Sequence, residues 1–279
     1  MNYMEETIIR SLLPVRARET HKGDYGKILL LCGSRGFTGA AALAARGALR
    51  TGAGLVYLAV PESIYVIEAV KLTEPVVMPL PDNDGMLCEA SMEKIAQLLP
   101  RMDAVLFGCG SGIGAGTEAV LAFLLKNAEC PLILDADGIT LAAKHKDVLR
   151  DRKAPTILTP HDGEFARLAP IDAPRIEQTM AMAADLGCTL LRKGYRTLIT
   201  DGKTCWENHT GNPGMATGGS GDVLAGIIAS LLGQKVPPLE AAAAAAWLHG
   251  RAGDICADNL GEYGMLPGDL VEELPRLLK

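Results

Sequence analysis

The stretch best suited to chemistry is a glycine-rich segment that leads into an acidic residue and an apolar helix pattern. Glycines recur through residues 211–221, Asp222 follows, and apolar residues then recur at helical spacing to Leu232. Glycine allows positive φ and close approach of other groups to the backbone. A helix N-terminus adds unpaired N–H groups and the positive end of the helix dipole. The segment therefore predicts an anion site, with phosphate as a natural ligand.

Asp222 has two possible roles in this setting. It could be the N-cap of the helix, because aspartate is a preferred residue there. It could instead be a general base that deprotonates a hydroxyl as that hydroxyl attacks a phosphoryl group. No lysine follows the glycines, so the segment is not a phosphate loop of the Gly-Lys-Ser/Thr type.

Residues 193–197, Lys-Gly-Tyr-Arg-Thr, form a second candidate. They follow a predicted strand and could hold nucleotide phosphates with a point charge and backbone amides. The alternative is an ordinary basic hairpin loop.

Three further polar residues stand at predicted strand ends. His161 could contact a substrate phosphate or hydroxyl, or simply be solvated. Glu164 could help hold a hydrated Mg²⁺ or interact with the first turn of a helix, and Asp135 could be a second acid or brace a loop. The remaining histidines at 145, 209 and 249 have no partner at metal-ligand spacing, so zinc is not predicted.

Alternating strands and helices must position these residues. The pattern predicts an α/β fold with a mostly parallel central sheet covered by helices on both faces, in one domain over residues 1–279. Ligands of such sheets bind beyond the carboxyl ends of the strands. Strands are expected at 28–32, 55–60, 75–80, 103–107, 131–135, 155–159, 189–192, 197–200 and 203–207. Helices are expected at 4–13, 40–50, 62–71, 89–99, 117–127, 175–187, 221–232, 238–257 and 267–278.

Composition narrows the class of protein. Hydrophobic residues make up 48% and charged residues 22% of the chain, which is typical of globular proteins. A net charge of -6 and an aromatic content of 4% argue against nucleic-acid and membrane partners. The seven cysteines are scattered without a C-x-x-C motif, and the N-terminus lacks a signal-peptide pattern. We therefore expect a cytoplasmic protein with reduced thiols.

Taken together, these motifs resemble those of the ADP/ATP-dependent NAD(P)H-hydrate dehydratases of the ribokinase-like superfamily. The resemblance covers nearly the whole chain. Its most specific segments are residues 158–165 (Leu-Thr-Pro-His-Asp-Gly-Glu-Phe), 192–194 (Arg-Lys-Gly) and 211–226.

The resemblance implies a lyase for metabolite repair. In this family ADP (or ATP), with Mg²⁺, phosphorylates the hydroxyl that hydration adds at C6 of NADH or NADPH (giving NADHX or NADPHX). Loss of phosphate then restores the cofactor. By position, Ala41, Gly110, His161 and Asp222 would contact the hydrated cofactor, with Asp222 as the catalytic base. The nucleotide would contact Lys193, Gly194, Tyr195, Arg196, Thr197 and Gly221. The resemblance assigns no metal ligand here.

The sequence departs from the family pattern at two positions. Cys109 replaces the proline expected in a Gly-Pro-Gly loop, and Ser220 stands where threonine is more usual. Only some twenty residues precede His21, so we expect the family's epimerase to be a separate protein and this chain to repair the S epimer alone. The family also suggests a homotetramer and, for stand-alone bacterial members, ADP as donor.

Other functions remain open at the level of sequence. A ribokinase-like kinase of a small hydroxylated vitamin precursor would share the glycine-Asp helix and release a stable phosphate ester. A nucleotide sensor would keep the loops without needing Asp222, whereas a purely structural subunit would not concentrate glycines at strand ends.

Overall fold

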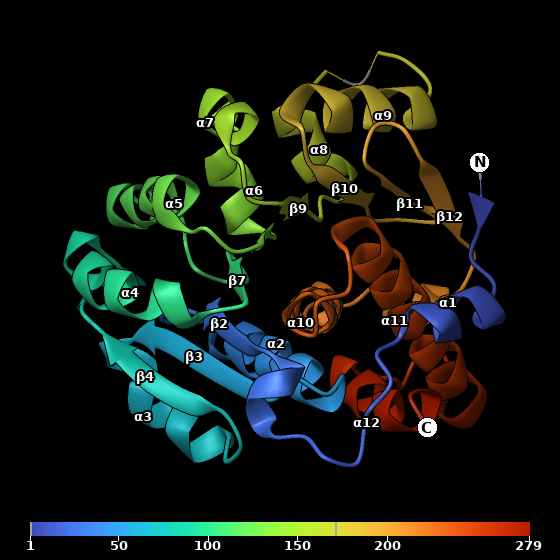
Figure 1. The fold of residues 1–279 in the computed structure, drawn as a ribbon, viewed down its shortest axis with the longest axis horizontal. Helices are drawn as coiled ribbons and strands as arrows, with labels where there is room; N and C mark the ends of the chain where they lie inside the picture. The colour runs from blue at the N-terminus through green and yellow to red at the C-terminus, as the bar shows by residue number, and fades with distance from the viewer. Residues whose placement is uncertain (1, 171) are drawn as a thin grey trace.

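A ten-stranded sheet forms the centre of the protein in the computed structural model, which describes residues 2–170 and 172–279 (Figure 1). The strand order is β1-β12-β11-β10-β9-β8-β7-β2-β3-β4. Within the described ranges, β11 runs antiparallel to both of its neighbours, and the other adjacent pairs are parallel. The predicted mostly parallel α/β fold is therefore confirmed.

The bounds of the elements are as follows. The strands are β1 (Asn2–Tyr3), β2 (Lys27–Leu31), β3 (Leu55–Pro61), β4 (Val76–Leu80), β5 (Asp82–Asn83), β6 (Met86–Leu87), β7 (Ala104–Phe107), β8 (Leu132–Leu134), β9 (Thr156–Leu158), β10 (Thr189–Arg192), β11 (Thr197–Thr200) and β12 (Cys205–Asn208). The helices are α1 (Glu6–Leu12), α2 (Thr38–Arg50), α3 (Glu62–Lys71), α4 (Met92–Leu98), α5 (Ala115–Asn127), α6 (Asp137–Ala142), α7 (Lys146–Asp151), α8 (Asp162–Leu168), α9 (Arg175–Leu186), α10 (Ser220–Gly233), α11 (Pro238–Leu260) and α12 (Pro267–Leu277). Short 3-10 turns lie at Lys22–Tyr25, Glu89–Ser91, Leu99–Arg101 and Pro213–Met215.

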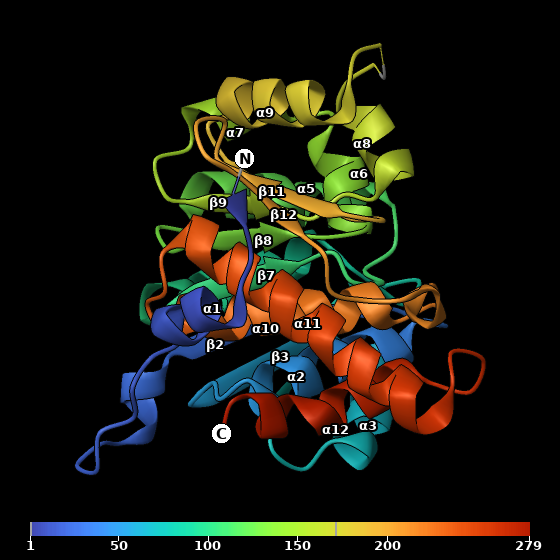
Figure 2. The ribbon, with the colours of Figure 1, turned by 90° about the vertical axis from the view of Figure 1, so that its right-hand side faces the viewer.

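Two hydrophobic cores lie on the two faces of the sheet. Side chains alternate along β2, so Ile28 and Leu30 enter one core while Leu29 and Leu31 enter the other. Helices α2, α10, α11 and α12 build the first core, and α4 to α9 cover the second face. Figure 2 shows this layering around strands β8, β11 and β12, with α7 and α9 on one side and α10 to α12 on the other.

Helices α2 and α10 approach each other closely because glycines face the contact. A Cβ atom at Gly226 of α10 would lie 2.1 Å from the carbonyl oxygen of Ala44, and one at Gly47 of α2 would lie 2.7 Å from that of Val223. Neither position could carry a side chain without moving backbone. This contact fixes the start of α10, which carries Ser220, Gly221 and Asp222.

The sequence patterns missed several short elements and misplaced some ends. The segment between β8 and α9 holds α6, α7 and α8, helices of six or seven residues, too short to show a clear apolar period. The helix expected at 89–99 is a 3-10 turn followed by α4. The two-residue β1, which pairs with β12, and the small β5–β6 pair were also not expected. Among the described residues, no helix has the length and apolar character needed to cross a membrane.

Candidate active site

A pocket of about 810 Å³ lies at the carboxyl ends of the strands, where the sequence analysis predicts that ligands bind. Its walls come from the β10–β11 turn, the segment after β12 and the first turn of α10. The lining includes Lys193, Gly194, Tyr195, Arg196, Thr197, Gly221, His161, Ser220, His249 and residues 208–213 and 215–218. The structure thus brings together all six residues predicted to contact a nucleotide, and their role stays a prediction.

A buried network of Asp135, Thr159 and Lys193 adjoins this pocket. The Lys193 ammonium lies 2.7 Å from Asp135 Oδ1, and the Thr159 hydroxyl donates to the same oxygen at 2.6 Å. Burial alone would lower the pKa of Lys193, but the charges of Asp135 and Glu164 outweigh it and raise the pKa. Lys193 is therefore a fixed cation at the pocket wall. Asp135, predicted as a second acid or a brace, holds this lysine.

Asp222 lies in the first turn of α10, two residues after the helix begins at Ser220. The N-cap is Gly219, whose φ of 100° lies in the left-handed region. The N-cap interpretation of Asp222 is therefore wrong, because glycine takes the cap position. Burial raises the pKa of Asp222 to about 6, and the negative charge of Asp135 adds to the shift. A carboxylate with this pKa is suited to accept a proton near neutral pH.

Gly221 lines the pocket and lies beside Lys193 and Asp135. A Cβ atom at this position would lie 3.3 Å from Lys193 Nζ and 3.8 Å from Asp135 Oδ2. The missing side chain therefore leaves the cation and the carboxylate within reach of a ligand at the helix N-terminus.

Cys109, which replaces the expected proline, packs against the two acids. Its thiol lies 3.6 Å from Asp135 Oδ2. The neighbouring Cys32 thiol, burial and the charge of Asp135 raise the pKa of Cys109 well above its usual value. Within residues 2–170 and 172–279, potential metal-ligating atoms converge in one group of three or more, formed by Cys109, Asp135 and Asp222. A thiol is a poor ligand for Mg²⁺, which prefers oxygen, so this group does not form a protein cage for magnesium.

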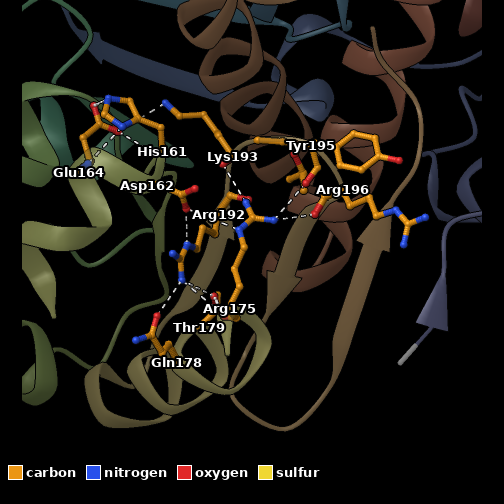
Figure 3. Close-up of polar contacts among 12 residues, drawn as sticks. His161, Asp162, Glu164, Arg175, Gln178, Thr179, Arg192, Lys193, Tyr195 and Arg196 are labelled. Atoms are coloured by element: carbon orange, nitrogen blue, oxygen red, sulfur yellow. Dashed lines mark hydrogen bonds and ion pairs between the residues drawn. The ribbon is translucent and has the colours of Figure 1, made fainter. Parts of the chain in front are cut away.

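His161 and Glu164 cap helix α8 for each other (Figure 3). The backbone N–H of His161 donates to Glu164 Oε2 at 2.9 Å, and the N–H of Glu164 donates to His161 Nδ1 at 3.2 Å. Glu164 is buried, and its Oε2 lies 3.8 Å from Lys193 Nζ. These contacts match the helix-turn alternative for Glu164, and the Mg²⁺ alternative stays a prediction. His161 is exposed and reaches the pocket.

Three of the four residues predicted to contact the hydrated cofactor, namely Ala41, Gly110 and Asp222, are not among the residues that line the pocket. Ala41 is fully buried in α2. Gly110 has a φ of 60°, and a Cβ atom there would lie 2.9 Å from that of Ala40. The loop after β7 therefore packs on the start of α2. The contacts of Ala41 and Gly110 with substrate stay predictions.

Sequence reasoning overlooked His249 and Arg175. His249 of α11 lies 3.2 Å from the Ser220 hydroxyl, and burial lowers its pKa to about 4, so the ring is neutral at pH 7. Arg175, the first residue of α9, binds the backbone of the β10–β11 turn (Figure 3). Neither has a sequence signal, because their partners lie 29 and 17–21 residues away.

Comparison with known proteins identifies the family. Residues 28–276 match the family model described as NAD(P)H-hydrate dehydratase. The chain is 34% identical to the ADP-dependent (S)-NAD(P)H-hydrate dehydratase of Listeria monocytogenes, over 96% of this chain and 92% of that protein. It is 43% identical to the bifunctional NAD(P)H-hydrate repair enzyme Nnr of Moorella thermoacetica, over 97% of this chain and 52% of the relative. The chain thus spans about half the length of its bifunctional relatives.

A solved structure shows the same fold. The ADP/ATP-dependent NAD(P)H-hydrate dehydratase of Bacillus subtilis, co-crystallised with ATP/Mg²⁺, superposes with a TM-score of 0.85 at 32% identity. The alignment covers 99% of this chain and 97% of that structure. Together with the pocket and its acidic helix N-terminus, these matches show that the chain belongs to the ribokinase-like NAD(P)H-hydrate dehydratase family.

Proposed function

We propose that this protein is an ADP-dependent (S)-NAD(P)H-hydrate dehydratase. The observation that carries the proposal is the position of Asp222, whose pKa is raised to about 6, beside a pocket lined by residues 193–197 and Gly221. Family membership names the substrates that such a pair of sites would serve, namely ADP and hydrated NADH or NADPH.

Asp222 would act as the general base. It accepts the proton of the C6 hydroxyl while the hydroxyl oxygen forms a bond to the β-phosphorus of ADP and the bond from that phosphorus to AMP breaks. Elimination then breaks the C6–O bond and releases phosphate, while the neighbouring ring carbon gives up a proton to water and a C=C bond forms. The products are the repaired cofactor, AMP and phosphate. Asp135 is held by Lys193 and Thr159, which leaves Asp222 as the acid available to take the proton.

Lys193 and the start of α10 would hold the phosphates. Lys193 supplies a fixed positive charge, while the first turn of α10 supplies backbone N–H groups and the helix dipole. Both would therefore stabilise the negative charge that shifts between the phosphate oxygens during phosphoryl transfer. Ser220, held by His249, would keep this turn in place.

The remaining parts of the proposal rest on the family. Mg²⁺ would be carried by the nucleotide phosphates with few protein ligands, since the one convergent group of possible metal ligands among the described residues contains the Cys109 thiol. We also propose one catalytic domain over residues 1–279, a homotetramer, a cytoplasmic location and a separate NAD(P)H-hydrate epimerase as functional partner.

The direct test is recovery of NADH absorbance. The purified chain is incubated with NADH hydrate and Mg²⁺, with ADP or ATP at equal concentration. Recovery with formation of AMP supports the proposal, and strict dependence on ATP would reject the ADP-dependent form of it.

A kinase assay separates the alternative function. The vitamin-kinase alternative predicts stable phosphate esters from pyrimidine or thiazole alcohols and no recovery of NADH. Phosphorylation of these alcohols without dehydration of the hydrate would overturn the proposed function.

A further inference from the structure

Arg175 binds the turn between β10 and β11 from behind the pocket (Figure 3). Its Nη1 donates to the carbonyl oxygens of Tyr195 and Arg196 at 3.2 and 2.9 Å. Its Nη2 donates to those of Arg192 and Lys193 at 3.0 and 2.9 Å. One guanidinium thus binds four carbonyls of a single turn, which its planar set of donors allows.

These hydrogen bonds determine how the peptide groups of the turn face. A trans peptide is planar, so its N–H points opposite to its C=O. Because the carbonyls of Lys193 and Tyr195 point at Arg175, the N–H groups of Gly194 and Arg196 point away from it. Gly194 and Arg196 both line the pocket and both have positive φ, 140° and 55°. For Arg196 this conformation is strained. The Arg175 guanidinium stabilises it by donating hydrogen bonds to the carbonyl oxygens of Tyr195 and Arg196.

The guanidinium of Arg175 is itself held from a second side. Its Nε lies 3.5 Å from Asp162 Oδ1, and Arg192 Nε donates to the same oxygen at 2.7 Å. Arg192 is buried, and its guanidinium lies 3.9 Å above the ring of Phe165. Asp162 follows His161 at the start of α8, so the network joins the two walls that carry His161 and Lys193.

Arg175 is not among the residues that line the pocket, so any effect on a ligand must pass through the turn. We propose that Arg175 is a positioning residue for nucleotide phosphates, which holds residues 192–196 so that the N–H groups of Gly194 and Arg196 and the Lys193 ammonium face the phosphates of ADP. This inference rests on the proposed function, which places ADP in this pocket.

Binding measurements on Arg175→Ala and Arg175→Lys test the inference. We expect Arg175→Ala to raise the Kd and the KM for ADP by about tenfold or more, since several charge-assisted hydrogen bonds are lost. The affinity for NADH hydrate should stay within about twofold, because the hydrate is bound by other residues. Arg175→Lys should recover part of the loss, since lysine has a charge but no fork of donors. Arg150→Ala is the matched control, because Arg150 is a surface arginine of α7 that pairs with Asp147 and Asp185.

Chemical rescue separates positioning from a general loss of structure. Methylguanidinium added to Arg175→Ala should restore ADP affinity, while methylammonium at the same concentration should not. An ADP Kd within twofold of wild type in Arg175→Ala would overturn the inference. So would an equal loss of affinity for ADP and NADH hydrate together with a lower Tm. If Arg175→Ala does not fold, the same criteria apply to Arg175→Lys.

Amide hydrogen exchange without nucleotide tests the turn itself. Exchange over residues 193–197 should be faster in Arg175→Ala than in wild type and unchanged in Arg150→Ala. Unchanged exchange in Arg175→Ala would reject the inference. A wild-type chain that neither binds ADP nor repairs the hydrate would instead refute the proposed function, and the exchange result would still decide whether Arg175 holds the turn.

Discussion

At the scale of single residues, the site depends on two acids with different surroundings. Asp135 has short contacts with Lys193 and Thr159, whereas Asp222 is half-buried beside the negative charge of Asp135. When the environments of two neighbouring acids shift their pKa values apart, the two acids can be assigned different roles. Here Asp135 is the partner of a fixed cation, and the proposed function assigns Asp222 as the proton acceptor.

Substitution of Asp222 by asparagine tests this assignment. Asp222→Asn should lower turnover by a factor of about 10² to 10⁴, because the proton acceptor is lost. Its stability at pH 7 should not fall. A raised carboxyl pKa means that the charged form of Asp222 disfavours the folded state, and asparagine is neutral. ADP affinity should stay the same or rise.

Turnover, ADP binding and urea unfolding are measured on the same preparation. Asp258→Asn, a change at an exposed position of α11, serves as the control. Turnover of Asp222→Asn within a few-fold of wild type would remove Asp222 from the mechanism and direct attention to Asp135.

The pH dependence of turnover follows from the pKa of Asp222. A base works in its deprotonated form, and burial raises the pKa of Asp222 to about 6. Activity should therefore be nearly constant above pH 7 and decline as the pH falls through about 6, approaching tenfold per pH unit. The residual activity of Asp222→Asn should lack this decline. A decline centred near the ordinary aspartate value, with the protein still folded, would contradict the assignment.

At the scale of elements, the contact between α2 and α10 positions α10, the helix that carries Asp222. Gly226→Ala should destabilise the protein by about 1–3 kcal/mol, because its Cβ would lie 2.1 Å from the Ala44 carbonyl oxygen and the helices must separate. Gly39→Ala, where a Cβ meets nothing within 4 Å, should be neutral or gain up to about 1 kcal/mol. Urea unfolding of the two variants decides the point. Equal stabilities would show that α2 and α10 can separate without cost.

At the scale of the whole molecule, the proposed function requires two small molecules to be bound with their reacting groups in line. The hydroxyl must face Asp222 and the phosphoryl group together, a geometry that only one epimer at C6 can satisfy. The chain alone should therefore repair only the S epimer of NADH hydrate and leave the R epimer. Chromatographic separation of the epimers before and after reaction measures this. Complete conversion of both, with spontaneous epimerisation shown to be slow, would refute it.

The sequence determined the fold class and most of the candidate residues, because the signals for both are local. Apolar runs such as 28–32 indicate buried parallel strands, and the glycines of 211–221 predict a site where the backbone can approach an anion closely. The carboxyl ends of parallel strands meet at one edge, so the clusters at 159–164, 193–197 and 211–222 could be expected to lie together. They do so around one pocket.

Only the tertiary structure decided which side chains pair. The Lys193–Asp135 contact joins residues 58 positions apart. Arg175, at the start of α9, binds the turn between β10 and β11. The cap position of α10 also depended on the fold, since the left-handed Gly219 takes it and Asp222 does not. Such pairings and cap positions follow from how helices pack on the sheet. That packing depends on the whole chain, whereas the spacing of residues along a segment predicts only the local structure of that segment.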